Sequence, residues 1–180
     1  AVPGGGAQVP IWILGSSLYG AQLAALLGLP FAFASHFAPA AMMQAIDIYR
    51  TRFEPSAQQE RPYVMLGFNV CAAETDDEAR FLRTSATQSF LKLRSGTPGR
   101  LPPPVDGLEL TPVQQKMLDE MRSASAVGSA ETVAKEIDHF LLKTGADELI
   151  VSCQIYEHPK RLRSYEIVSE VTGLQTNAAA

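Results

Sequence analysis

Residues Val9–Leu23 read VPIWILGSSLYGAQL and set the expected fold of this chain. The run is apolar, breaks at Gly15-Ser16-Ser17 and resumes with helical spacing, which predicts a strand, a tight turn and a helix. At such a junction the unpaired N–H groups of the first helical turn and the positive end of the helix dipole point to one place. The turn is therefore a candidate phosphate site, although a plain helix cap made by Ser16 or Ser17 explains the same residues equally well.

Length, composition and charge limit the kind of protein to which this junction can belong. The chain has 180 residues, of which 46% are hydrophobic and 19% charged, as is typical of a globular domain with a sizeable core. A net charge of −4 without a basic cluster argues against a nucleic-acid partner. The longest apolar stretch, residues 23–34, is broken by Gly28 and Pro30 and is too short to span a bilayer. No signal-peptide pattern opens the chain. Cys71 and Cys153 fall in predicted strands, where buried reduced thiols are expected. Both observations lead us to expect a cytoplasmic protein.

Strand and helix patterns alternate along the rest of the chain. The Gly- and Pro-rich segment 95–111 predicts an exposed excursion, either a lid or an insertion, and Thr75 and Glu78 match a capping box. We expect strands at 9–14, 29–35, 62–71 and 148–155 and helices at 18–27, 39–54, 75–94, 111–121, 129–144 and 159–171. The apolar sides expected from helical spacing include Leu23, Leu26 and Leu27 in the first helix, Met42, Ile46, Tyr49 and Phe53 in the second, and Leu162, Tyr165, Val168 and Val171 in the last.

Four alternations of strand and helix predict an α/β fold with a parallel sheet and helices packed outside it. The sheet is either a complete open one or half of a (β/α)8 barrel, which needs eight strands and about 250 residues. The Gly- and Pro-rich opening at 1–8 has the composition of a connector and favours the half barrel, with more chain expected upstream. In both architectures ligands bind beyond the carboxyl ends of the strands. We therefore expect Gly15–Ser17, His36, 72–74 and 154–157 on the same rim.

Five segments of the sequence resemble the bacterial luciferase-like flavin-dependent monooxygenases. They are PIWILGSS at 10–17, AQLAA at 21–25, GLPFAFASHF at 28–37, VGSAETV at 127–133 and GADELIV at 145–151. The resemblance extends over residues 10–173. It implies a partial TIM barrel that holds strands five to eight, with residues 1–176 forming the C-terminal half of the domain and 177–180 a disordered tail.

The resemblance also implies a cofactor site at the turn described above. In the family this turn holds the phosphate of the flavin, which agrees with the anion site argued from the residues themselves. By position, Gly15, Ser16, Ser17, the N–H groups around Leu18, and Gly20 are the expected phosphate contacts. Family members also contact the flavin from earlier strands, and this chain offers no residues for those contacts.

The chemistry implied by the family is oxidation of a small organic substrate by reduced FMN and dioxygen through a flavin C4a-hydroperoxide. A separate flavin reductase commonly supplies the reduced FMN, and the phosphate turn alone does not distinguish FMN from a deazaflavin. In this setting His36 is the candidate catalytic residue, since it can donate to a peroxide or accept a proton, and a packed, hydrogen-bonded histidine is the alternative. Asn69 can hydrogen-bond a flavin edge or satisfy neighbouring backbone. We expect the isolated half barrel to be inactive and to associate through its exposed sheet edges, as a homo-oligomer for example.

Other polar residues have simpler explanations. His139 falls in an amphipathic helix and His158 beside a helix start, so the histidines lack metal-ligand spacing and no metal is expected. The carboxylates at 74–78 suit helix capping, and Lys160, Arg161 and Arg163 suit a solvated face. Two functions besides the monooxygenase stay open from the sequence: a flavin- or phosphate-binding module without turnover, and an unrelated α/β fold whose Gly-Ser-Ser turn is only a cap.

Overall fold

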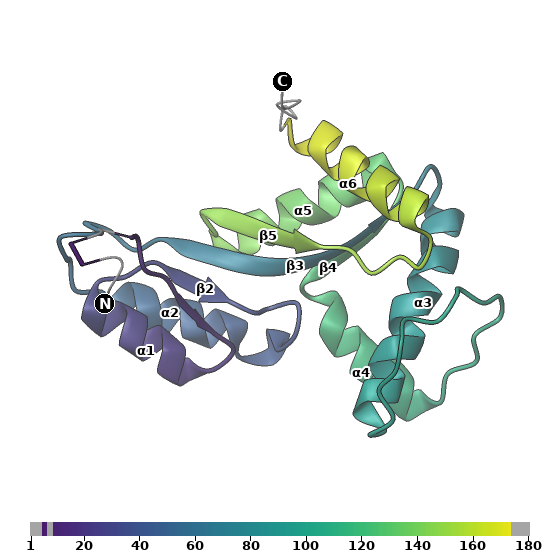
Figure 1. Cartoon of the computed structure of the whole chain (residues 1–180), viewed down its shortest axis with the longest axis horizontal. Coiled ribbons are helices and arrows are strands. Elements are labelled where there is room, and N and C mark those ends of the chain that lie inside the picture. The colour runs from purple at the N-terminus through teal and green to yellow at the C-terminus, as the bar shows by residue number, and fades with distance from the viewer. Residues whose placement is uncertain (1–4, 7–8, 174–180) are drawn as a thin grey trace. The chain divides into compact units, whose positions relative to one another are not determined.

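The computed structural model describes residues 5–6 and 9–173 and divides into two compact units. Unit 1 takes in the chain up to Leu66 together with Ala146–Leu149, and unit 2 takes in Gly67–Gly145 and the chain from Ile150 onward (Figure 1). Two strands, β3 (Val64–Ala72) and β5 (Glu148–Ser152), contribute residues to both units. Most of the predicted connector at 1–8 and the predicted tail at 177–180 lie outside the described residues.

Unit 1 is built on the short strand β1 (Ile13–Gly15) and its parallel neighbour β2 (Phe31–Phe33). Helix α1 (Leu18–Leu27) connects the two strands, and a 3-10 turn (Pro39–Ala41) leads into α2 (Met42–Arg52). The first residues of β3 then pair in parallel with β2. Helices α1 and α2 pack against each other (Figure 1). The predicted strand, turn and helix at the start of the chain are confirmed.

Strand β1 begins later than expected because the backbone before it bonds to a side chain. The N–H of Ile11 donates to Oε1 of Gln58 at 3.0 Å, and Nε2 of Gln58 donates to the carbonyl of Ile11 at 2.8 Å. These groups therefore do not join the parallel ladder, which starts at Ile13 opposite Phe31. The expected strand at 9–14 was thus too long, since the apolar run alone could not show which backbone groups pair.

The core of unit 1 gathers around Tyr49. Its ring lies 5.4 Å from that of Phe31 and 5.5 Å from that of Phe53, between centroids. Its hydroxyl donates to the carbonyl of Leu29 at 2.9 Å and accepts the N–H of Tyr63 at 3.1 Å. One buried side chain therefore ties together the chain just before β2 and the chain just before β3. The predicted inward face of α2 is confirmed, with Met42, Ile46 and Tyr49 all buried.

The predicted inward face of α1 is wrong. Leu26 and Leu27 are exposed, Leu26 by 61%, whereas Ala21, Ala24 and Ala25 are fully buried. Small side chains let α1 approach its neighbours closely, so the alanine stripe rather than the leucines faces the core. The helix ends at Gly28 with φ +60, in the left-handed region that glycine adopts without strain.

Unit 2 continues from β3 through four helices and the strands β4 and β5. After β3 come α3 (Asp76–Arg94), α4 (Pro112–Arg122), β4 (Ser125–Gly128), α5 (Ala130–Thr144), β5 and α6 (His158–Thr172). Strand β4 pairs in parallel with β3, Asn69 opposite Ser125, and β5 also pairs with β3. Helices α3 and α5 pack against β4, and α6 packs beside α5 (Figure 1).

Strand β4 is an addition to the four strands expected. Its four residues, Ser-Ala-Val-Gly, are too short and too rich in small side chains to show a strand pattern. The strand forms because β3 offers it a ladder: the N–H of Asn69 donates to the carbonyl of Ala124, and the N–H of Ala73 to that of Gly128. The simple fourfold alternation is therefore corrected to five strands, with α3 and α4 in succession between β3 and β4.

The predicted inward face of α6 is also partly wrong. Leu162 is 48% exposed and Tyr165 39% exposed, while Ser164, Ile167 and Val168 are buried. Polar tethers set this orientation, because the N–H of Ala72 donates to Oγ of Ser164 at 2.9 Å. The N–H of Cys153 likewise donates to the hydroxyl of Tyr165 at 3.0 Å. Hydrophobic spacing gave no sign of these two hydrogen bonds.

Both cysteines of the chain are free and buried, as predicted. Burial raises the pKa of the Cys71 thiol to about 12 and raises that of Cys153 as well. Of the helices in residues 9–173, none combines the length and the apolar character needed to cross a bilayer.

Candidate functional site

The turn between β1 and α1 carries a row of unused backbone donors. Within the described residues, no protein acceptor takes the N–H groups of Ser16–Gly20. Ser16, Ser17 and Tyr19 are exposed, and Leu18 is half-buried. The carbonyl of Gly15 accepts the N–H of Ala34 at 2.9 Å, and Gly20 is buried. The N–H groups of Ser16–Tyr19 are therefore open to a ligand from solvent.

No side chain of the turn compensates the partial positive charge at the start of α1. Ser17 occupies the N-cap position with an extended backbone, φ −138 and ψ 165, but its hydroxyl makes no cap hydrogen bond. The first turn of α1 holds no acidic residue. A plain cap would use the Ser17 hydroxyl to satisfy one of the free N–H groups. The positive end of α1 therefore keeps its affinity for an anion.

The two glycines of the turn are not required by the backbone. Both Gly15 and Gly20 have φ outside the left-handed region. A Cβ added at either would lie 3.5 Å from the Cα of the other, which is ordinary contact, and near the ring of Phe31. The two glycines therefore face each other and the Phe31 ring, where β1 and α1 approach closely, and Gly20 is buried.

His36 lies at the same end of unit 1 as the turn. Strands β1 and β2 run parallel with Gly15 opposite Phe33, so the turn and His36 both follow the carboxyl ends of neighbouring strands. The imidazole is half-buried, and this burial lowers its pKa below the ordinary value of 6.5. His36 is therefore neutral at pH 7, able to donate from one ring nitrogen and accept at the other.

Asn69 and the other predicted rim residues belong to unit 2. The Oδ1 of Asn69 accepts a hydrogen bond from the hydroxyl of Ser152 on β5 at 2.7 Å. This side-chain bond was not among the expected roles of Asn69. At the ends of β3 and β5, Arg163 pairs with Glu74 at 2.8 Å and Lys160 with Glu78 at 2.5 Å, which joins 74–78 to the start of α6.

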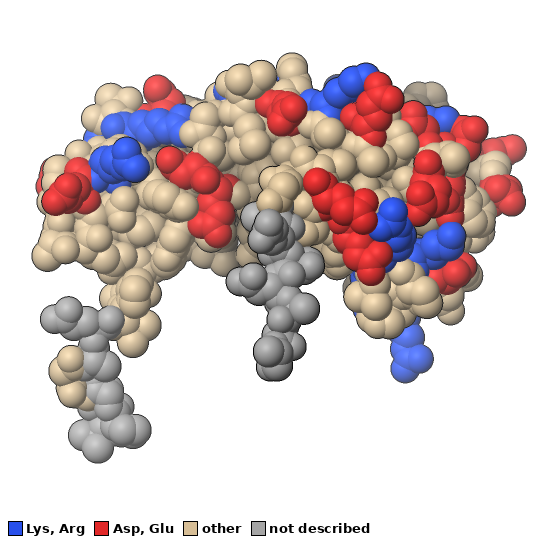
Figure 2. Space-filling model, turned by 90° about the horizontal axis from the view of Figure 1, so that it is seen from above, with Lys and Arg blue, Asp and Glu red and all other residues tan. Residues whose placement is uncertain are grey.

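These ion pairs add detail to two expectations from the sequence. The solvated face expected for Lys160 and Arg163 carries ion pairs, because Arg163 also contacts Glu166 and Glu170. The capping box is only half formed: Thr75 Oγ1 accepts the N–H of Glu78, while the Glu78 carboxylate goes to Lys160. Figure 2 shows positive and negative side chains interspersed on the face it draws, as such pairing requires.

The acidic start of α3 also caps a second helix. The Oδ1 of Asp76 accepts the N–H of Ser129, the N-cap residue of α5, at 2.7 Å. This hydrogen bond and those from the Thr132 and Ser129 side chains lower the pKa of Asp76. The prediction that 74–78 serve capping is confirmed for Thr75 and Asp76, although the partner helix could not be read from spacing.

Comparison with protein families decides between the fold alternatives. The family model described as "Luciferase-like monooxygenase" matches residues 1–148. The chain belongs to this family. A luciferase-like monooxygenase of Escherichia coli strain K12 is 48% identical over 172 residues, which cover 94% of this chain and 51% of that protein. The alternative of an unrelated α/β fold is therefore wrong, and the chain spans about half the length of the curated relatives it matches.

Solved structures agree with this family membership. The apo form of MsnO8 superposes with a TM-score of 0.77 at 30% identity, over 92% of this chain and 52% of that one. The oxygenating constituent of 3,6-diketocamphane monooxygenase from Pseudomonas putida, solved in complex with FMN, gives a TM-score of 0.58 at 20% identity over 92% of this chain and 48% of that one. The second likeness shows the fold alone. The parallel α/β architecture is consistent with a fragment of the family's TIM barrel.

One feature of this family member was missed from the sequence: a cleft in unit 2 between α3, the 95–111 segment, α4 and β4. The signal available was a polar face on α3, where Arg80, Arg83, Thr84 and Thr87 follow helical spacing. The 95–111 segment forms part of its wall, so this excursion packs on α3 rather than extending freely into solvent. In the part of the chain that the structure describes, no three His, Cys, Asp or Glu side chains lie close enough to hold a metal ion.

Proposed function

We propose that this chain forms the flavin-phosphate-binding half of a flavin-dependent luciferase-like monooxygenase. In this proposal the whole protein is an oxidoreductase that uses reduced FMN and dioxygen to oxidise a small organic substrate. The five strands described here form part of its (β/α)8 barrel, and the remaining strands come from other parts of the protein. A flavin reductase supplies the reduced FMN.

One observation carries the proposal: the N–H groups of Ser16–Tyr19 have no protein acceptor within the described chain, at the exposed end of α1. A phosphate dianion satisfies several of these donors at once and is stabilised by the helix dipole. The unused hydroxyl of Ser17 adds a further donor at the same place. Membership of the luciferase-like family supports assigning this phosphate to FMN.

The rest of the site positions the reaction. The flavin supplies the oxygen activation when bound, and the chain binds and orients it. His36 follows the strand next to the turn and is neutral at pH 7, so it is suited to hold or accept a proton near the reacting atoms. Asn69 remains the proposed contact to the flavin edge.

Titration of the intact protein with FMN and with riboflavin tests the phosphate site. We measure quenching of flavin fluorescence for the wild type, Ser17→Asp and Ser17→Asn. Aspartate and asparagine both cap helices well, so both variants keep α1, but only aspartate repels a phosphate. We expect Ser17→Asp to weaken FMN binding at least about tenfold, Ser17→Asn to change it much less, and riboflavin to be indifferent to the charge.

Two other outcomes carry clear meanings. Equal FMN affinity in the wild type and Ser17→Asp would show that the phosphate is not bound at this turn. Tight FMN binding without faster consumption of dioxygen by the reduced FMN complex would support the non-catalytic binding module instead of the enzyme.

A further inference from the structure

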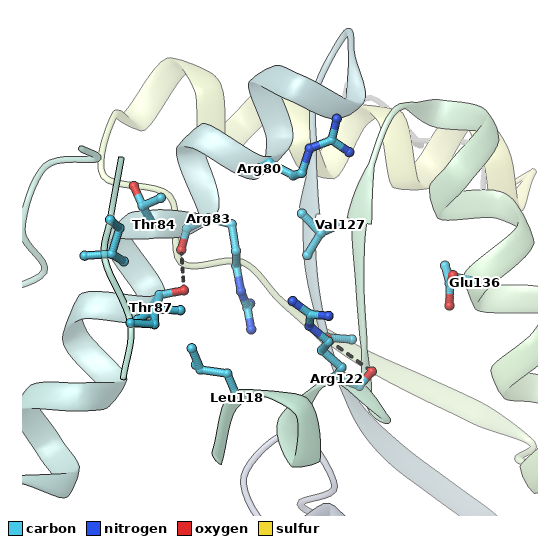
Figure 3. Close-up of a pocket in the computed structure, with 11 residues that line it drawn as sticks. Arg80, Arg83, Thr84, Thr87, Leu118, Arg122, Val127 and Glu136 are labelled. Atoms are coloured by element: carbon cyan, nitrogen blue, oxygen red, sulfur yellow. Dashed lines mark hydrogen bonds between the residues drawn. The ribbon is translucent and has the colours of Figure 1, made fainter. Parts of the chain in front are cut away.

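Unit 2 contains a cleft of about 500 Å³ that the flavin site does not use. One part of its lining is aliphatic, with Leu108 and Leu110 from the 95–111 segment and Leu118 from α4. The opposite part is basic, with Arg80, Arg83 and Arg122 (Figure 3). A volume of this size is within the range of small-molecule sites in proteins.

Arg83 differs from the other two arginines in its partners. Arg80 pairs with Asp77, and Arg122 pairs with Asp119 at 3.4 Å. Across residues 5–6 and 9–173, no carboxylate oxygen lies within 4 Å of the Arg83 guanidinium. Figure 3 shows the Arg83 side chain extending into the cleft between Leu118 and Arg122, with Glu136 on the far side.

A guanidinium in this position costs free energy. Burial lowers the pKa of Arg83, and the neighbouring charge of Arg122 lowers it further. A charge removed from water is tolerated when it is paired, and the guanidinium fork fits a carboxylate or phosphate with two parallel hydrogen bonds. The Arg83 guanidinium is therefore suited to bind an anion that enters the cleft.

The hydroxyl groups that line the cleft already donate their protons to the backbone. The Thr84 hydroxyl donates to the backbone carbonyl of Phe81 at 2.6 Å. The Thr87 hydroxyl donates to the backbone carbonyl of Arg83 at 3.2 Å, and the Ser125 hydroxyl to the backbone carbonyl of Arg122 at 3.3 Å. Their protons are thus used on backbone carbonyls, and the guanidinium groups remain as the donors for an anion. Thr84 also accepts the N–H of Val105 at 2.9 Å, which holds the 95–111 wall in place.

We propose that this cleft is a binding site for a small organic anion, with an oxyanion head on Arg83 and Arg122 and an aliphatic body against Leu108, Leu110 and Leu118. The head is a carboxylate or a phosphate monoester, since both present the oxygens that a guanidinium binds. The leucines distinguish such a ligand from a bare inorganic ion. None of these residues belongs to the Ser16–Gly20 turn, so the proposal stands apart from flavin binding.

Calorimetric titration of the intact protein tests the site with three six-carbon probes: hexanoate, hexyl phosphate and the neutral hexanol. The buffer is zwitterionic and free of phosphate, sulfate and carboxylates, and each titration is repeated with saturating FMN. We expect saturable binding of at least one anion, unchanged by FMN, and no binding of hexanol of comparable strength. The relative affinities of hexanoate and hexyl phosphate tell which head group the arginines prefer.

Four variants assign the binding to the guanidinium groups. Arg83→Gln raises the Kd of the anion about tenfold or more, and Arg83→Lys, which keeps the charge but loses the fork, falls in between. Arg122→Gln changes a 71% exposed side chain that the fold does not depend on, and raises the Kd severalfold. Arg94→Gln, on α3 but outside the cleft, serves as the matched control and leaves the Kd unchanged.

Thermal unfolding separates a ligand site from a structural role. Without anion, Arg83→Gln unfolds at a temperature no lower than the wild type, because it removes an unpaired buried charge. With hexanoate or hexyl phosphate, the wild type gains stability and the variant does not. The proposal is overturned if the wild type binds neither anion, if Arg83→Gln and Arg122→Gln bind as well as the wild type, or if Arg83→Gln is clearly destabilised in the absence of ligand.

Discussion

Replacement of Leu18 by proline removes one phosphate donor from the turn and leaves the helix in place. Leu18 is the first residue of α1, the helical position at which proline is best tolerated. The preceding residue, Ser17, has φ −138 and ψ 165, in the extended region that a following proline favours. The lost N–H has no protein acceptor within the described chain, so folding gives up no backbone hydrogen bond.

The effect on FMN binding follows from the energy of one charge-assisted hydrogen bond. Such a bond contributes about 1.5–3 kcal/mol, which corresponds to about a 10- to 150-fold rise in Kd for Leu18→Pro. Leu18→Ala is the matched control, because it shortens the same half-buried side chain and keeps the N–H. The ratio of the two Kd values therefore isolates the amide donor.

The assay is quenching of FMN fluorescence, with urea unfolding to confirm that both variants are folded. Riboflavin provides a second ligand without the phosphate, and its Kd is expected to be the same in both variants. If folded Leu18→Pro and Leu18→Ala bind FMN equally well, the amide of residue 18 does not touch the phosphate. The electrostatic basis of the proposed function would then be refuted at this turn.

Three further changes test the fold around the site. Tyr49→Phe removes the hydroxyl that bridges two backbone groups, so we expect the free energy of unfolding in urea to fall by about 2–3 kcal/mol. The control Tyr156→Phe, at an exposed position, changes the free energy of unfolding by less than about 0.5 kcal/mol. Gly28→Ala combines a φ of +60 with a clash between the new Cβ and the backbone oxygen of Glu54, so we expect it to lower the free energy of unfolding by about 2–5 kcal/mol. Gly96 has a φ of +75 but open space around it, so Gly96→Ala lowers the free energy of unfolding only by the conformational part, about 1–2 kcal/mol. Burial raises the pKa of Cys71 to about 12, so its thiol is barely ionised at pH 8. We therefore expect a thiol-specific disulfide reagent to label Cys71 in the unfolded chain but not in the native protein. Rapid labelling of Cys71 in the native protein would contradict this burial.

The strand, turn and helix around the phosphate site could be predicted because their signals are local. The break at Gly15–Ser17 marks the turn, Leu18–Leu27 was placed correctly, and Gly28 ends the helix in the left-handed conformation. The parallel arrangement followed from the alternation of strands with helices. Local backbone preference and hydrophobic spacing are sufficient for these features, since each depends on residues a few positions apart.

Predictions failed where contacts between distant residues decide the outcome. The leucines of α1 were expected inside, but close packing selected Ala21, Ala24 and Ala25 instead. Strand β4 exists because β3 pairs with it, a partner that its own four residues do not specify. The orientation of α6 is likewise set by hydrogen bonds from Ala72 and Cys153 to its side chains.

The same division applies to the two sites. Sequence alone located the turn proposed to bind an anion, because a helix start after a Gly-Ser-Ser break carries free N–H groups wherever it occurs in a fold. Only tertiary structure could show that those N–H groups stay without a protein acceptor in the described chain, and that no carboxylate oxygen of the described chain lies within 4 Å of the Arg83 guanidinium in its cleft. Helix dipoles and turn conformations arise from neighbours along the chain, whereas burial and pairing of a charge depend on residues that folding brings together.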